Sequence, residues 1–268
     1  MAELFGYSIE RTKKVKGSGK SFSTPTPVDG TIDVAGGGFF GQILDVDGRE
    51  KTELDLIRRY RDISSQSECD SAIEDIVNEG IVSNEKDQAV EIDLDRLPYT
   101  DKIKRKIRTE FDEVLRLLDF EAKGHDIFRR WYVDGRVYYH KLIDDANPRK
   151  GICELRYIDP TKIKKVREIE KDKDPKTGIE LIKKINEYFV YNEKGILLDG
   201  MGGGGPMQGI KIAIDSITYV PSGLMDGNSG RIMSYLHKAI KPVNQLRMIE
   251  DAIVIYRISR APERRIFY

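Results

Sequence analysis

Apolar side chains near the end of the chain recur at steps of three and four residues, the spacing of a helix with one buried face. The stripe consists of Ile232, Leu236, Ala239, Ile240, Val243, Leu246, Ile249, Ala252, Ile253 and Tyr256. Pro242 lies inside this pattern, and proline removes a backbone donor and clashes with the preceding turn. We therefore expect a kink or break between Ile240 and Pro242, with a short helix from about Ile232 and a longer one to about Ser259.

The same spacing predicts helices in the first half of the chain, beginning near Thr52, Ser67, Thr100 and Gly124. Ser67 and Thr100 are residue types that cap helix N-termini. The helix after Thr100 is the most clearly amphipathic. Its apolar face is formed by Ile103, Ile107, Phe111, Val114, Leu115 and Leu118.

From Gly135 onward the pattern changes to an alternation rich in β-branched and aromatic residues, which is typical of strands. Strands are predicted at 136–144, 154–159, 162–169, 182–192, 194–199 and 210–220, and a shorter one at 89–94. Helices and strands are segregated along the chain, and turn residues join the strands. This order predicts an α+β fold with N-terminal helices, a mostly antiparallel β block and a long C-terminal helix.

The first fifty residues differ from the rest, because they are rich in Gly, Ser, Thr and Pro and show no apolar period. We expect a flexible arm over 1–50, an α+β domain over 51–230, and a helical segment over 231–268. Phe39 and Phe40 could form a short docking patch in the arm. The last residues, 264–268, look like the start of a strand, so we expect the chain to be the front part of a longer protein.

Composition excludes several classes. The 268 residues include 45 basic and 45 acidic side chains, so bulk charge gives no reason to expect attraction to nucleic acid or membranes. The longest apolar runs are far shorter than a membrane span, and the start has no apolar region of a secretory signal. Cys69 and Cys153 are far apart, which favours two reduced thiols.

Motifs for catalysis are incomplete. Residues 17–21 read GSGKS, but Lys14 stands where a phosphate-binding loop needs glycine, and no strand or helix flanks the motif. The glycines of 202–205 read as a hairpin loop. His125 and Asp126 form an HD pair without further metal-binding partners at a suitable spacing. A phosphoester hydrolase using His125 and Asp126 therefore stays an alternative, while the main expectation is a chain with no catalytic, metal-binding or cofactor-binding residues.

Two basic clusters are candidates for contacts with other subunits or with DNA. The first is Lys102, Lys104, Arg105, Lys106 and Arg108. Cations at a helix N-terminus oppose the helix dipole, so an anionic partner surface would stabilise them. The second is Arg257, Arg260, Arg264 and Arg265, which follow the long helix and equally fit capping of its C-terminus. A nucleic-acid-binding module using the first cluster is a further alternative, with salt-dependent affinity as its mark.

Four long segments carry a family resemblance: FRRWYVDGRVYYHKLID, ELRYIDPTKIKKVREI, EYFVYN and YLHKAIKPVNQLRMIEDAIVIYRISRAPERRIFY. Together they resemble the portal, or head-to-tail connector, proteins of T-even-like contractile-tailed bacteriophages, including cyanophages. The likeness extends from about Thr52 to Tyr268.

The resemblance implies a homo-oligomeric ring, of about twelve subunits, at one vertex of the capsid. Such a ring nucleates head assembly with the major capsid and scaffold proteins, holds the terminase motor, passes double-stranded DNA and receives the neck and tail. It would be found in the virion, and in the host cytoplasm during assembly. On this map 52–230 is the wing, 231–259 runs toward the stem, and the clip, the crown and the returning stem helix are missing. The family offers no catalytic residues to transfer.

Overall fold

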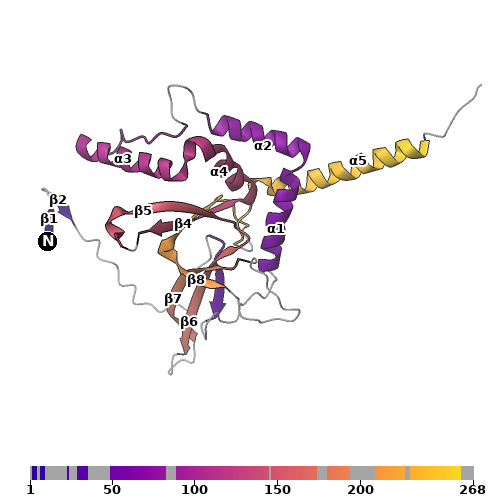
Figure 1. Ribbon diagram of the computed structural model, residues 1–268. Coiled ribbons are helices and arrows are strands. Elements are labelled where there is room, and N and C mark those ends of the chain that lie inside the picture. The colour runs from indigo at the N-terminus through magenta and orange to yellow at the C-terminus, as the bar shows by residue number, and fades with distance from the viewer. Residues whose placement is uncertain are drawn as a thin grey trace, which may run out of the picture.

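A computed structural model describes residues 2–4, 7–9, 23, 29–35, 49–82, 89–144, 146–173, 180–193, 209–226 and 230–260. After three short strands, four helices are followed by a block of strands, and a long helix ends the described chain (Figure 1). The predicted α+β class is thereby confirmed. Five features of the sequence lie outside the described residues. They are the motif at 17–21, the Phe39–Phe40 patch, the expected strand at 194–199, the glycines of 202–205 and the expected strand at 264–268.

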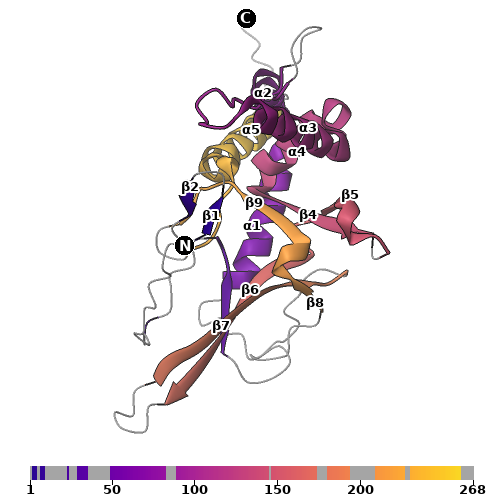
Figure 2. The ribbon, with the colours of Figure 1, turned by 90° about the vertical axis from the view of Figure 1, so that its left-hand side faces the viewer.

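Four helices form one layer: α1 (Arg49–Ser64), α2 (Ser67–Gly80), α3 (Asp101–Leu118) and α4 (Phe120–Asp134). In Figure 2, α2, α3 and α4 lie above the sheets, and α1 runs from them down beside the strands. The core between α1, α2, α4 and the segment before the last helix is built from Tyr60, Ile73, Val77, Val133 and Leu236, all buried. Each large apolar side chain removed from water contributes about 1.5–3 kcal/mol, so this cluster holds the layer together.

Two helix starts differ from the sequence prediction. The N-cap of α2 is Gln66, so Ser67 is the first helical residue and not the cap. α4 begins at Phe120, because Asp119 adopts a left-handed φ of 50° that separates it from α3. Gly124 is buried inside α4, where an added Cβ would lie 3.1 Å from the ring of Phe120. This glycine therefore reflects close packing within the helix and does not mark its start.

The strands form two main sheets. The first has the order β3-β6-β7-β8, and the second has the order β5-β4-β9. Their bounds are β3 (Ile32–Ala35), β4 (Arg136–Ile143), β5 (Ile152–Ile158), β6 (Ile163–Lys173), β7 (Glu180–Tyr191), β8 (Ile210–Ala213) and β9 (Ile217–Pro221). A separate hairpin joins β1 (Ala2–Leu4) to β2 (Tyr7–Ile9). All pairings are antiparallel except that of β3 with β6, so the predicted mostly antiparallel block is confirmed.

The single strand expected at 210–220 is two strands in two different sheets. A 3-10 turn, η2 (Ile214–Ser216), separates β8 from β9 and carries the chain from the first sheet to the second. The sheets share an apolar core of Tyr138, Ile163, Phe189 and Ile217. A second short 3-10 turn, η1 (Pro148–Lys150), lies between β4 and β5.

Part of the expected arm belongs to the fold. β3 pairs with β6 along its whole length, and Tyr219 donates a hydrogen bond of 3.0 Å to the backbone oxygen of Asp29. The side chain of Asp29 also pairs with Lys165 on β6. Residues 29–35 are thus an edge of the sheet, which the low apolar content of the arm did not indicate.

The strand predicted at 89–94 is not formed: its residues are bends and coil, and no strand among the described residues pairs with them. Leu94 is nevertheless buried. Alternation of apolar and polar residues is therefore not sufficient for a strand where no partner edge is available.

The C-terminal helical segment changes type near Pro242, where we expected a break. A 3-10 turn, η3 (Tyr235–Ala239), is followed by α5 (Ile240–Arg260), which places Pro242 in the first turn, where no helix carbonyl needs its missing N–H. The expected start at Ile232 is wrong, because Ile232 forms an isolated β-bridge with Met225. α5 projects away from the rest of the molecule (Figure 1). Within the described ranges, no helix is both long and apolar enough to cross a membrane.

Candidate assembly surfaces

The base of α5 is fixed by a buried ionic cluster. Arg136 at the start of β4 and Lys164 on β6 both pair with the carboxylate of Glu53 on α1, and these side chains are almost fully buried. Arg136 also donates a hydrogen bond of 2.8 Å to the backbone oxygen of Ile232. One carboxylate therefore connects the helical layer, both sheets and the segment that leads to α5.

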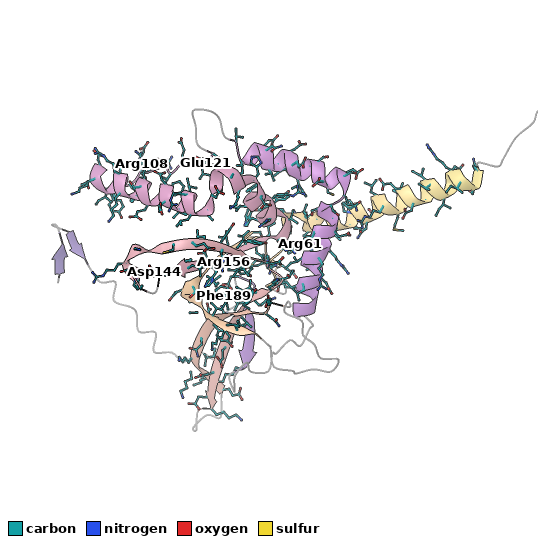
Figure 3. The ribbon with its side chains drawn as sticks, in the orientation of Figure 1. Arg61, Arg108, Glu121, Asp144, Arg156 and Phe189 are labelled. Atoms are coloured by element: carbon teal, nitrogen blue, oxygen red, sulfur yellow. The ribbon has the colours of Figure 1, made fainter. Side chains whose placement is uncertain are left out.

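A second ionic cluster joins α1 to the last residue of α4 and to the residue that follows β5. Arg61 donates two hydrogen bonds of 2.8 Å to Asp134 and two of 3.1 Å to Asp159. The bonds to Asp134 raise the pKa of the Arg61 guanidinium above its ordinary value. Burial raises the pKa of Asp159, but hydrogen bonds from Arg61 and Thr161 outweigh it and hold that pKa below its ordinary value. Figure 3 shows Arg61 on α1, facing the interior of the molecule.

A pocket of about 470 Å³ opens beside Arg61. Its charged lining is paired: Arg129 contacts Asp70, and Arg130 lies 2.7 Å from Asp126. The guanidinium of Arg130 also stacks over the ring of Tyr157. Because these charges are balanced, the pocket offers little attraction to a charged ligand.

The segment before α5 is held by hydrogen bonds to distant parts of the chain. The hydroxyl of Ser234 donates a hydrogen bond of 2.9 Å to the backbone oxygen of Tyr132. It also accepts a hydrogen bond of 3.0 Å from the backbone amide of Leu236. The side chains of Tyr60 and His237 lie within hydrogen-bond distance of each other. Arg247 on α5 donates a hydrogen bond of 3.0 Å to the carboxylate of Asp62 on α1. The direction in which α5 leaves the domain is thus set by several independent contacts.

Beyond this base, α5 is uncovered. None of its residues is buried. The exposed apolar side chains are Leu246, Met248, Ile249, Ile253, Val254, Ile255, Tyr256 and Ile258. Because successive residues are rotated by about 100°, Ile249, Ile253 and Tyr256 lie on one side, and Val254 and Ile258 lie on the opposite side. The predicted buried face is therefore exposed within the described chain, and α5 also exposes Val254 and Ile258 on a second side, which they share with Arg247 and Asp251.

α3 is the second incompletely covered helix. It has no buried residue, and Ile103 and Val114 of its apolar face are 46% and 42% exposed. Thr100 is the N-cap as predicted, although its side chain makes no capping hydrogen bond. The five cations of the first basic cluster lie on this helix, all exposed except the half-buried Lys104. None of them forms an ion pair with a described residue of the chain.

The second basic cluster is only partly described. Arg257 is exposed in the last turn of α5, and the guanidinium of Arg260 lies 4.3 Å from the ring centroid of Tyr256. Arg264 and Arg265 lie outside the described residues. The two clusters are not brought together, because α3 and α5 lie at opposite ends of the molecule (Figure 1).

The residues of the hydrolase alternative do not form a site in the described part of the chain. His125 and Asp126 are exposed on α4, and Asp126 is paired with Arg130. No group of three or more His, Cys, Asp or Glu side chains among the residues described is placed to hold a metal ion. Cys69 and Cys153 are both free thiols.

Sequence reasoning missed Glu53, Arg136 and Lys164. A signal was present, because Arg136 and Lys164 each stand two residues before a buried strand residue, Tyr138 and Val166 respectively. Residues two apart on a strand share a face. A basic residue on the inward face of a strand indicates a buried ion pair.

The comparisons with known proteins agree on one family. The model of the family described as "Bacteriophage T4-like portal protein (Gp20)" matches residues 53–268. The chain is 40% identical over 260 residues to the "Portal protein" of Vibrio phage KVP40, an alignment that covers 93% of this chain and 50% of the relative. It is 33% identical over 248 residues to the "Portal protein" of Salmonella phage ViI, covering 90% and 44% respectively. The chain spans about half the length of these curated relatives. It belongs to the bacteriophage T4-like portal protein family.

Proposed function

We propose that this chain is part of a structural portal subunit, which assembles with its own copies into a ring at a unique vertex of a tailed-phage capsid. The ring nucleates head assembly with the major capsid and scaffold proteins, docks the terminase motor, conducts double-stranded DNA and connects the head to the neck and tail. It belongs to the virion, after assembly in the host cytoplasm, and it has no catalytic role. The support is membership of the portal family and the shared name of both relatives.

The observation that carries the ring assembly is the exposure of α5. Large apolar side chains exposed in groups on a soluble protein mark surfaces of association, and α5 exposes them on two opposite sides, with Ile253 49% and Ile258 69% exposed. In a ring, each subunit meets one neighbour on either side through two different surfaces. Neighbouring copies would thus cover both sides of α5. We assign 51–230 to the wing of the subunit and α5 to the approach to the stem.

The test uses the full-length protein that contains this chain. Negative-stain electron microscopy and mass measurement at micromolar concentration should show closed rings of about twelve copies. A protein that stays monomeric under all assembly conditions, or that forms open filaments, would contradict the proposal.

A further inference from the structure

α2 and the first half of α3 carry opposite charges on their exposed surfaces. α2 contains Glu68, Asp70, Glu74, Asp75 and Glu79 and no basic residue. α3 presents the first basic cluster in its first two turns, with Asp101 as the only acidic residue there. The chain as a whole has a formal net charge of zero. The two helices thus form an acidic and a basic patch on an otherwise balanced molecule.

Neither patch is neutralised within the described chain. The α3 cations have no ion pair with a described residue, and of the α2 acids only Asp70 has one, with Arg129. Several charges also oppose the dipole of their own helix: cations lie at the N-terminus of α3, and Glu79 lies in the last turn of α2. Each such placement costs about 0.3–1 kcal/mol. A surface of opposite charge would offset this cost on both helices.

Both patches also contain exposed apolar side chains. Ile103 is exposed on α3, and Leu97 and Tyr99 are exposed just before it. Ile76 on α2 and Val82 just after it are exposed as well. Apolar residues surrounded by charged ones are typical of the surfaces through which protein subunits associate.

The two patches do not meet within one chain. α2 and α3 lie roughly end to end across the same side of the molecule, and the N-terminus of α3 points away from α1 and α2 (Figure 1). A head-to-tail contact joins two different surfaces of identical subunits. Translation of a second copy along this side would bring the basic end of its α3 to the α2 of the first.

We propose that the basic N-terminal half of α3 in one copy docks on the acidic face of α2 in the next copy. This inference rests on the proposed ring and names the surfaces through which neighbours recognise each other. A second copy is favoured over DNA or an anionic lipid surface because the complementary acidic patch is present on the same chain, and four of its five carboxylates have no ion pair with a described residue.

The test reverses the charges of each patch in the full-length protein. The α3 variant carries Lys104→Glu, Arg105→Glu and Arg108→Glu. The α2 variant carries Glu74→Lys, Asp75→Lys and Glu79→Lys. Each variant alone should form at least tenfold fewer rings than the wild type in electron microscopy, because like charges then face each other across the contact. The affected side chains are exposed or half-buried, so circular dichroism should show both variants folded.

Mixing provides the decisive result. When the two variants are mixed in equal amounts, the acidic α3 of one fits the basic α2 of the other, and the two wild-type patches fit each other. Rings should therefore reappear with alternating subunits, and a chain carrying all six changes should also form rings. A matched control, Lys173→Glu with Lys183→Glu and Lys184→Glu, changes three exposed lysines of β6 and β7 and should leave the rings intact.

Failure of this pairing is distinguishable from failure of the ring. A wild-type protein without rings contradicts the proposed function. Wild-type rings that persist in both variants, or variants that do not complement each other, overturn the pairing of α3 with α2 alone. The α3 variant could also keep its rings but lose a salt-sensitive binding to duplex DNA or to anionic lipid vesicles. That result would overturn the pairing of α3 with α2 and would assign the cations to that ligand.

Discussion

The phenolic oxygen of Tyr60 lies 2.8 Å from Nδ1 of His237, across 177 positions of the sequence. Tyr60 is fully buried in α1, and His237 belongs to η3, the turn from which α5 begins. The two rings also meet edge to face, with their centroids 6.0 Å apart. This contact ties the direction of α5 to the helical layer, so changes at either residue should act on both stability and assembly.

Tyr60→Phe removes the hydroxyl and leaves the ring in the core. We expect the free energy of unfolding to fall by about 0.5–1.5 kcal/mol, the net value of one hydrogen bond. Denaturant unfolding followed by circular dichroism measures this loss. In a double-mutant cycle with His237→Gln, the two losses should be less than additive; full additivity would mean that the pair does not interact.

Gly135→Ala should be much more damaging than its size suggests. Gly135 has a φ of 71°, and an added Cβ would lie 2.8 Å from the backbone oxygen of Met233. The left-handed conformation and the backbone clash together should lower the free energy of unfolding by about 2–4 kcal/mol. Gly223 has a φ of 79° but no atom within 4 Å of such a Cβ. Gly223→Ala should therefore cost only about 1–2 kcal/mol, and equal losses at both sites would refute the contact.

The sequence was sufficient to predict elements whose apolar pattern is satisfied locally. The strands β6 and β7 and the long helix that ends near Ser259 required no knowledge of neighbours, although the expected break is only a change of helix type between Ala239 and Ile240. The failures depended on tertiary partners. Residues 89–94 alternate, but no described strand pairs with them, and 210–220 is split because η2 moves the chain between sheets. The stripe of α5 has a correct helical period, yet what covers it is not part of the described chain.

Candidate residues follow the same division. The α3 cations could be selected from sequence because their position conflicts with the helix dipole. The acidic face of α2 was not recognised as their complement, because the sequence alone shows neither which charges are already paired nor how the helices are placed. Arg129, for example, neutralises Asp70 from a helix 59 positions away.

Glu53→Gln tests the buried cluster. The change leaves Arg136 and Lys164 buried without the carboxylate that both contact. Removing one partner of a buried ion pair costs about 3–5 kcal/mol, so we expect a large drop in the unfolding midpoint. Glu113→Gln, which removes an exposed partner of Arg116 on α3, is the control and should leave the midpoint unchanged.

The Arg61 cluster predicts a dependence of stability on pH. The pKa of Asp159 in the fold lies below its ordinary value of 3.8. Its contribution to stability is therefore present above that value and is lost as the pH falls through the lower, folded value. Asp159→Asn should reduce the free energy of unfolding by about 1–2 kcal/mol near neutral pH. The difference from the wild type should shrink steadily below about pH 4; a constant difference would exclude a role for ionised Asp159.

The exposed sides of α5 predict variants that separate folding from assembly. Ile249→Lys with Ile253→Lys changes one side, and Val254→Lys with Ile258→Lys changes the other. All four side chains are at least 49% exposed, so each pair should alter the free energy of unfolding of the folded chain by no more than about 0.5 kcal/mol per site.

Each pair should nevertheless abolish rings, because a lysine ammonium cannot be buried against a neighbour without a partner. Since every subunit needs both neighbours, either side alone is sufficient for the loss. Glu250→Lys makes the same change of two charges at an exposed position of α5 that is rotated by about 100° from Ile249 and lies between the two sides, so it should leave rings intact. If only one pair of variants blocked assembly in electron microscopy, then a single side of α5 would be in the interface, and the other side would face solvent in the ring.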